Sequence, residues 1–227
     1  MGRTFNKVAV LKGGISSERE VSLRSGAAIA QGLRDGGYDV FEIDIVAKDF
    51  SLPEWIEAVF IALHGEFGED GEIQQLLSDK NIPFTGSGAA SCRVSFDKVL
   101  TRNCLQENGV SVPRGELIEE SAERTIDFPL VVKPPREGSS VGCHIVSDAA
   151  HWVAAFSDAA GYSGQALVEE YIPGRELTVG IVDGEVLPVV EIKPAAEWYD
   201  FEAKYVTGDT EYIVPAVLEK DMAARLQ

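Results

Sequence analysis

The chain has 227 residues, of which 45% are hydrophobic and 25% are charged, a composition typical of one large globular domain or two smaller ones. Its 20 Lys and Arg residues against 37 Asp and Glu residues give a formal net charge of −17. The electrostatic field of this negative charge repels nucleic acid and anionic membrane surfaces, so we expect neither as a partner. Any ligand that carries phosphate would need local cations.

Cysteine usage and the absence of long apolar runs predict the compartment. The three cysteines are an odd number without CxxC spacing, which is typical of a reducing compartment without structural zinc. No basic-then-apolar leader occurs, and no apolar run approaches the ~18 residues of a membrane span. We therefore expect a cytoplasmic protein.

The first third of the chain has the pattern of a parallel α/β unit. The apolar run at 8–11 ends in Gly13-Gly14, and Ser17 with Glu20 forms a capping-box pattern that predicts a helix to about Arg34. Strands are predicted at 38–45 and 58–63, and a short helix at 71–79. This order predicts an open parallel sheet.

Two residues of this unit are candidates for ligand binding. Glu18 follows Gly13-Gly14, which lacks the later glycine of a dinucleotide fingerprint, so an ordinary helix start with a dipole-complementing carboxylate is the alternative. His64 ends an apolar strand and precedes a glycine-rich loop, where it can bind a carboxylate or exchange a proton. Packing and capping of that loop is the alternative.

The middle of the chain begins after the turn-rich segment 83–88, which predicts a domain boundary. The segment 95–98 is predicted to open a helix that runs to about Asn108, with Lys98 in its first turn. The helix dipole disfavours a cation there, so Lys98 is either a phosphate contact or a solvated lysine.

A possible phosphate loop follows the apolar run 130–132. Lys133 ends that run, two prolines exclude a helix, and Ser139 and Ser140 lie in a loop flanked by Gly138 and Gly142. Backbone N–H groups in such a loop can turn toward an anion, whereas an exposed hairpin loop is the alternative.

The segment 165–182 predicts a strand, a turn and a second strand, after a helix at 148–160. A purine can stack on Tyr171 and Ile172, and a carboxylate such as Glu176 can accept hydrogen bonds from ribose hydroxyls. The alternative is a strand–turn–strand unit with a charged rim.

Together these stretches resemble the D-alanine–D-alanine ligases of the ATP-grasp superfamily. The matching segments cover nearly the whole chain: GGISSEREVSL at 13–23, FIALHG at 60–65, GEDG at 68–71, PFTGSG at 83–88, DK at 97–98, VKPPREGSSVG at 132–142 and YDFEAKY at 199–205. The resemblance implies a mixed α/β and α+β fold, an ATP-grasp with an N-terminal, Rossmann-like open parallel α/β domain. The expected domains are 1–94, 95–180 and an incomplete 181–227.

The resemblance also implies a mechanism. ATP phosphorylates the carboxylate of one D-alanine, and the amino group of a second D-alanine attacks the acyl phosphate, for peptidoglycan precursor synthesis. Glu18 would bind the first ammonium and His64 would lie beside its carboxylate, with Ser139 and Tyr205 hydrogen-bonded to Glu18. The implied nucleotide-binding residues are Lys98, Lys133, Ser140, Glu169, Tyr171, Ile172, Glu176 and Lys204.

The loop 197–210 indicates which second substrate the chain would use. Tyr205 resembles the tyrosine of ligases that make D-Ala-D-Ala, whereas relatives that make D-Ala-D-lactate differ in this loop. A ligase of that other specificity is therefore the alternative. The resemblance also implies a possible homodimer.

The chain departs from the family at its carboxyl end. The family's Glu-x-Asn-x-x-Pro-Gly segment, which supplies carboxylates for Mg²⁺ or Mn²⁺, does not occur in these residues. We assign no metal ligand and expect those ligands beyond Gln227. The chain as written is expected to be inactive, and a non-catalytic nucleotide-binding module is a further alternative.

Overall fold

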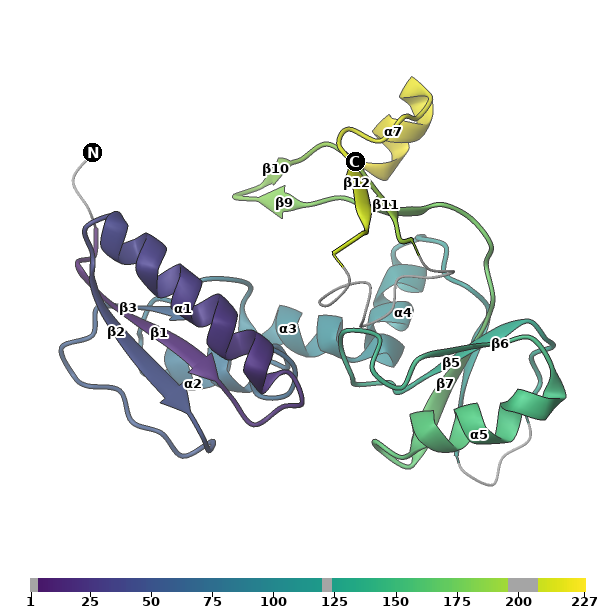
Figure 1. Cartoon of the computed structure of the whole chain (residues 1–227), viewed down its shortest axis with the longest axis horizontal. Helices are drawn as coiled ribbons and strands as arrows, with labels where there is room; N and C mark the ends of the chain where they lie inside the picture. Colours follow the sequence, from purple (N-terminus) through teal and green to yellow (C-terminus); the bar gives the residue numbers. More distant parts are fainter. Residues whose placement is uncertain (1–3, 120–123, 196–207) are drawn as a thin grey trace. The chain divides into compact units, whose positions relative to one another are not determined.

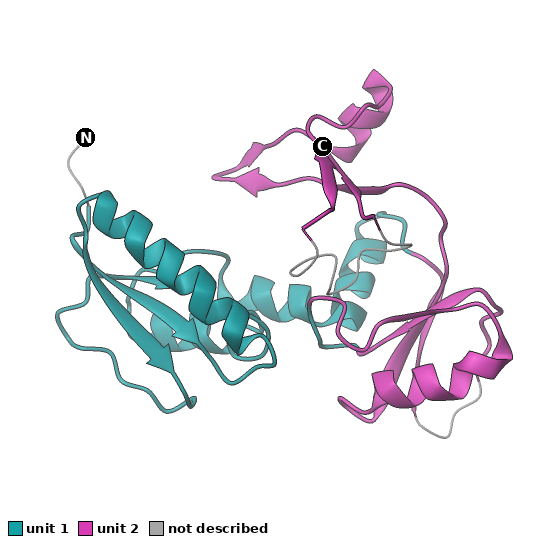
Figure 2. Cartoon of the chain, viewed as in Figure 1, with its two compact units in different colours: residues 1–112, 135–138 teal, residues 113–134, 139–227 magenta. Residues whose placement is uncertain are grey.

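The structure is a computed structural model that describes residues 4–119, 124–195 and 208–227. It divides into two compact units, shown in different colours in Figure 2. Unit 1 comprises residues 1–112 and 135–138, and unit 2 comprises residues 113–134 and 139–227. The predicted domain limits after residues 94 and 180 stay predictions.

Unit 1 contains a three-stranded sheet in the order β2-β1-β3. The strands are β1 (Lys7–Gly13), β2 (Asp39–Ile45) and β3 (Ala58–Ile61), and β1 pairs in parallel with both neighbours. The predicted open parallel sheet is therefore confirmed. Glu18 follows the carboxyl end of β1 and His64 follows that of β3, and ligands collect at this edge of such sheets.

Helices cover both faces of this sheet (Figure 1). Val10 of β1 packs in one cluster with Ala30 of α1 (Arg19–Asp35), whereas Leu11 packs in another with Leu77 of α2 (Glu72–Asp79). Adjacent strand residues point to opposite faces, so the two clusters lie on the two sides of β1.

Two local expectations for unit 1 need correction. The helix start at Ser17 is wrong, because α1 has Glu18 as its N-cap residue and that side chain makes no capping hydrogen bond. Instead Oγ of Ser16 accepts from the Glu18 N–H at 3.2 Å. The turn-rich segment 83–88 leads into a helix that the sequence pattern did not predict, α3 (Ala89–Phe96), which has no buried residue and hence no clear apolar period. The predicted helix after Asp97 is present as α4 (Lys98–Glu107).

Unit 2 begins with a four-stranded antiparallel sheet in the order β4-β7-β5-β6. Its strands are β4 (Gly115–Glu119), β5 (Leu130–Lys133), β6 (His144–Val146) and β7 (Gln165–Glu170). The helix α5 (Ala149–Ala160) packs Phe156 and Ala159 against Leu130 and Val132 in the core of this unit. The sheet thereby fixes the strand β5 that ends in Lys133.

The remainder of unit 2 consists of small elements. A three-stranded sheet has the order β12-β11-β8, and a two-stranded hairpin joins β9 and β10. The bounds are β8 (Glu176–Thr178), β9 (Ile181–Val182), β10 (Glu185–Val186), β11 (Val190–Lys193), β12 (Glu211–Ile213) and α7 (Lys220–Leu226). None of the described helices combines the length and the apolar composition that a membrane crossing demands.

Candidate active site

The predicted site residues are divided between the two units. Unit 1 carries Glu18, His64 and Lys98, whereas unit 2 carries Lys133, Ser139, Ser140, Glu169, Tyr171, Ile172 and Glu176. Lys204 and Tyr205 fall outside the described residues, as does most of the predicted loop 197–210. The predicted convergence of Lys98 and Lys133 on one nucleotide joins residues of different units and stays a prediction.

Glu18 is a buried carboxylate at the turn between β1 and α1. Only 5% of the residue is exposed. A Cβ atom added to Gly65 would lie 3.1 Å from its Oε2, and one added to Gly138 would lie 3.3 Å from it. The carboxylate therefore lies against the backbone of two loops, and glycine at both positions makes this close approach possible.

His64 follows β3 and lies beside two polar side chains. Its Nε2 is 3.0 Å from Oγ of Ser25, and its Nδ1 is 3.7 Å from Oε1 of Glu69. The interaction with the Glu69 carboxylate raises the pKa of His64, with partial burial opposing and the negative charge of Glu18 adding to the rise. The imidazole is therefore held closer to its protonated form than an ordinary histidine.

Ser16 links the two residues. Its hydroxyl donates to the backbone carbonyl of His64 at 2.7 Å and accepts from the backbone N–H of Glu18 at 3.2 Å. We call Ser16, Glu18, Ser25, His64 and Glu69 the Glu18 cluster. An anionic carboxylate and a histidine of raised pKa within it provide complementary partners for the ammonium and the carboxylate of an amino acid.

Lys98 holds the first half of the predicted phosphate loop. It opens α4 after Asp97, its backbone N–H donates to the carbonyl of Pro135 at 2.9 Å, and its ammonium donates to the carbonyl of Glu137. Burial raises the pKa of Glu137, Lys98 opposes that rise, and the charge of Glu18 adds to it. Within unit 1, Glu137 and Glu18 are therefore close enough for their charges to interact.

In unit 2, Lys133 and Glu169 form an ion pair between neighbouring strands. Lys133 ends β5 and Glu169 lies in β7, and the ammonium contacts Oε2 of the carboxylate. The side chain of Glu169 is 8% exposed and that of Lys133 is 22% exposed. The buried acidic partner orients the lysine side chain at the strand end, where it can meet a phosphate.

The loop after Lys133 has an unusual backbone. Ser139 and Ser140 have φ angles of 50° and 63°, in a region that residues other than glycine rarely adopt. A Cβ atom at Gly142 would lie 2.7 Å from Cε2 of Tyr162 and 2.9 Å from Cγ of Pro134, so that position requires glycine. Backbone strain of this kind is concentrated at binding sites, which favours a ligand role for the two serines.

The predicted adenosine-binding residues lie at and after the end of β7. The Tyr171 backbone N–H donates to the carbonyl of Pro129 at 3.2 Å, and Ile172 is 60% exposed. Glu176 begins β8 and is also exposed. An exposed aliphatic side chain three residues after the buried Glu169 suits a flat apolar ligand face.

The described residues were also compared with the ligand sets that bind a divalent metal ion. No group of three or more His, Cys, Asp or Glu side chains in those residues is arranged to hold a metal ion. The Mg²⁺ or Mn²⁺ requirement therefore stays a prediction that the described side chains do not support.

The structure adds residues around the site to which the sequence analysis gave no role. Glu69 lies within the motif at 68–71, so its proximity to His64 along the chain was a usable signal. Ser25 lies two helical turns after Glu18, and nothing in the sequence pattern indicates its contact with His64. Arg19 binds Asp44 across 25 residues, and that contact appears only in the folded chain.

These features place the chain in the ATP-grasp class, in which a parallel α/β unit precedes an antiparallel sheet with a lysine and a glycine-serine loop. The family described as D-ala D-ala ligase C-terminus matches residues 102–227, and the one described as D-ala D-ala ligase N-terminus matches residues 47–87. A D-alanine--D-alanine ligase from Syntrophotalea carbinolica is 44% identical over 230 residues, covering 97% of this chain and 74% of the relative. The chain therefore belongs to the D-alanine–D-alanine ligase family.

Solved structures of this family have the same fold. The D-alanine--D-alanine ligase from Bacillus anthracis complexed with ATP has a TM-score of 0.81 and 30% identity, and the match covers 98% of this chain and 75% of that one. The VanG D-Ala:D-Ser ligase from Enterococcus faecalis has a TM-score of 0.78 and 25% identity, with 99% of this chain and 80% of that one covered. The predicted ATP-grasp fold is confirmed.

Proposed function

We propose that the chain binds ATP and D-alanine and takes part in the ATP-dependent ligation of two D-alanine molecules for peptidoglycan precursor synthesis. The observation that carries the proposal is the Glu18 cluster. It offers a buried carboxylate and a histidine of raised pKa, which together suit a small zwitterion. The names of relatives at 42–44% identity support the same substrate.

Each substrate group has a partner in this proposal. Glu18 binds the ammonium of the first D-alanine, and His64 binds its carboxylate through a charge-assisted hydrogen bond. Lys98 and Lys133 bind the phosphates of ATP, with Ser139 and Ser140 in the loop that shields them from water. Ile172 and Tyr171 support the adenine, Glu169 contacts it, and Glu176 accepts from the ribose.

The proposed reaction has two steps. A carboxylate oxygen of the first D-alanine attacks the γ-phosphorus of ATP, the bond to the bridging oxygen breaks, and ADP leaves with that electron pair. The neutral amine of the second D-alanine then attacks the acyl carbon and the peptide bond forms. Inorganic phosphate leaves with the electron pair of the broken carbon–oxygen bond and takes up the proton that the nitrogen loses. Lysine ammonium groups stabilise the negative charge on the transferred phosphoryl group in the first step.

Several finer points belong to the same proposal. We retain Mg²⁺ as the counter-ion of ATP, Lys204 as a further phosphate contact, and Tyr205 as a partner of Glu18 and Ser139. A homodimer and a cytoplasmic location, where ATP is abundant, complete the proposal. The alternative is that D-lactate or D-serine replaces the second D-alanine. D-serine is included because the Enterococcus faecalis relative is named a D-Ala:D-Ser ligase.

The test uses calorimetry and product analysis on the full chain. D-alanine is titrated in the presence of a non-hydrolysable ATP analogue and Mg²⁺, with L-alanine as the matched control. Binding of D-alanine that is lost in Glu18→Gln is the expected result. Any product formed on incubation with ATP and D-alanine, D-lactate or D-serine identifies the acceptor by mass, and such turnover would contradict the expectation that this chain is inactive. Binding of ATP without any D-alanine binding would contradict the proposal.

A further inference from the structure

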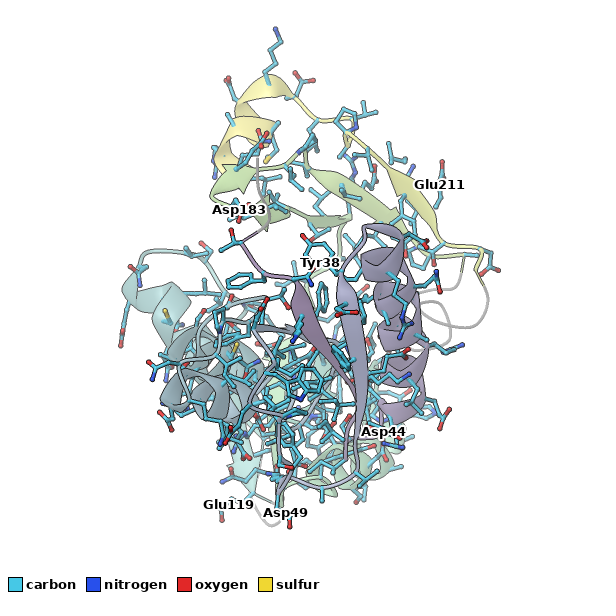
Figure 3. The ribbon with its side chains drawn as sticks, turned by 90° about the vertical axis from the view of Figure 1, so that its left-hand side faces the viewer. Tyr38, Asp44, Asp49, Glu119, Asp183 and Glu211 are labelled. Atoms are coloured by element: carbon cyan, nitrogen blue, oxygen red, sulfur yellow. The ribbon has the colours of Figure 1, made fainter. Side chains whose placement is uncertain are left out.

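Arg19 ties together three segments around the turn that carries Glu18. Its Nη1 and Nη2 donate to the two carboxylate oxygens of Asp44 at 2.8 and 2.7 Å. Nη1 also lies 3.1 Å from the carbonyl oxygen of Ile45 and 3.3 Å from that of Gly14. One guanidinium thus joins the end of β1, the start of α1 and the end of β2, where Figure 3 labels Asp44.

The turn needs such a tie because its own backbone is permissive. Gly13 and Gly14 have φ angles of 81° and 91°, and glycine loses more conformational freedom on folding than any other residue. A Cβ atom at Gly13 would lie 2.2 Å from Oδ1 of Asp44 and 2.5 Å from Nη1 of Arg19. The ion pair therefore lies directly on the turn, without room for a side chain between them.

The ion pair also determines where the charge of Arg19 acts. Hydrogen bonding to Arg19 lowers the pKa of Asp44, so the aspartate stays ionised and keeps the guanidinium neutralised. Asp44 thus holds the guanidinium at the end of β2, against the backbone of the turn.

We propose that Arg19 and Asp44 are positioning residues for the first amino-acid substrate: they fix the β1–α1 turn that presents Glu18. This inference rests on the proposed function, because it assigns to Glu18 the binding of the substrate ammonium. Arg19 and Asp44 themselves contact no substrate atom in this proposal. Their effect is transmitted through the backbone of 13–18.

The test compares Arg19→Ala, Arg19→Lys, Asp44→Ala and the double variant Arg19→Ala/Asp44→Ala in the full chain. We expect D-alanine affinity to fall about tenfold in Arg19→Ala, and affinity for the ATP analogue to stay within about twofold. Arg19→Lys should lose less, since it keeps the charge but not the two-pronged geometry. The double variant should bind D-alanine about as weakly as Asp44→Ala alone, because either single change already removes the same ion pair.

Arg34→Ala is the matched control. Arg34 lies on the same helix α1 and pairs with Glu42 of the same strand β2 at 2.7 Å, but near the other end of the helix. It should leave D-alanine affinity unchanged. If Arg19→Ala does not fold, Asp44→Asn provides the same comparison with a smaller change, since it removes the charge and keeps one acceptor.

The outcomes separate the inference from the function on which it rests. Equal D-alanine affinities in the Arg19, Asp44 and Arg34 variants, with normal binding by the unmodified chain, overturn the inference alone. Equal losses of D-alanine and ATP-analogue affinity also overturn it, since they indicate general destabilisation. An unmodified chain that binds the ATP analogue but no D-alanine overturns the proposed function and the inference together.

Discussion

Nδ1 of His64 lies 3.7 Å from Oε1 of Glu69, and this carboxylate is the main reason why the pKa of His64 is raised. In the proposed complex, His64 must be protonated to bind the substrate carboxylate. D-Alanine affinity is therefore expected to be full below the pKa of His64 and to fall as the pH rises through it. Glu69→Gln removes the charge, so the affinity should fall at lower pH.

The pKa of His64 in this variant can be measured by an NMR titration of the imidazole protons. Asp158→Asn provides the matched control, because Asp158 contacts Nε2 of His144 at 2.7 Å in the other unit. Glu69→Gln should shift the His64 titration, and Asp158→Asn should leave it unchanged. An unchanged His64 titration in Glu69→Gln would show that Glu69 does not control this histidine.

The Lys133–Glu169 ion pair predicts a stability effect that depends on which partner is removed. Lys133→Met takes the ammonium away from a carboxylate that is only 8% exposed, so the free energy of unfolding should fall by about 1–3 kcal/mol. Adding Glu169→Gln removes the buried charge and should restore part of that loss. Urea denaturation of the single and double variants measures both effects, and a further loss in the double variant would contradict the prediction.

Ser140 offers a test of strain in the phosphate loop. Its φ of 63° suits glycine better than serine, so Ser140→Gly should not lower the free energy of unfolding and can raise it by up to about 1 kcal/mol. Affinity for the ATP analogue should nevertheless fall, because the hydroxyl is lost and the loop is less ordered. Asp183→Gly is the matched control, since Asp183 has a φ of 50° in the turn between β9 and β10 (Figure 3). It should change stability similarly without affecting nucleotide binding.

Two helix caps separate stability from ligand binding. Asp97 accepts hydrogen bonds from the backbone N–H groups of Val99 and Leu100, and Asp148 accepts from those of Ala150 and His151. Substitution of either by alanine should cost about 1 kcal/mol of stability. Only Asp97→Ala should also weaken binding of the ATP analogue, since Lys98 lies in the turn that Asp97 caps. Equal nucleotide affinities in the two variants would count against a phosphate role for Lys98.

The local pattern determined much of the fold. Alternating and helical apolar periods indicated the strands of the parallel sheet. Asp148 marked the start of α5 within a residue, and the segment 95–98 contained the start of α4. These signals are local, because a strand or a capped helix depends on residues that are close in the chain. The start of α1 was predicted wrongly, since Ser16 and Ser17 carry the same hydroxyl and only the position of the His64 carbonyl selects Ser16.

The motifs by themselves named the family and the candidate ligands Glu18, His64, Lys98 and Lys133, because phosphate and zwitterion recognition require those chemical groups in any fold. Only the tertiary structure revealed that Glu69 raises the pKa of His64 and that Arg19 reaches Asp44. Such pairings depend on how strands and helices pack. The parallel alignment of β1 and β2 brings residues 25 positions apart to the same edge of the sheet, and no local pattern encodes that distance.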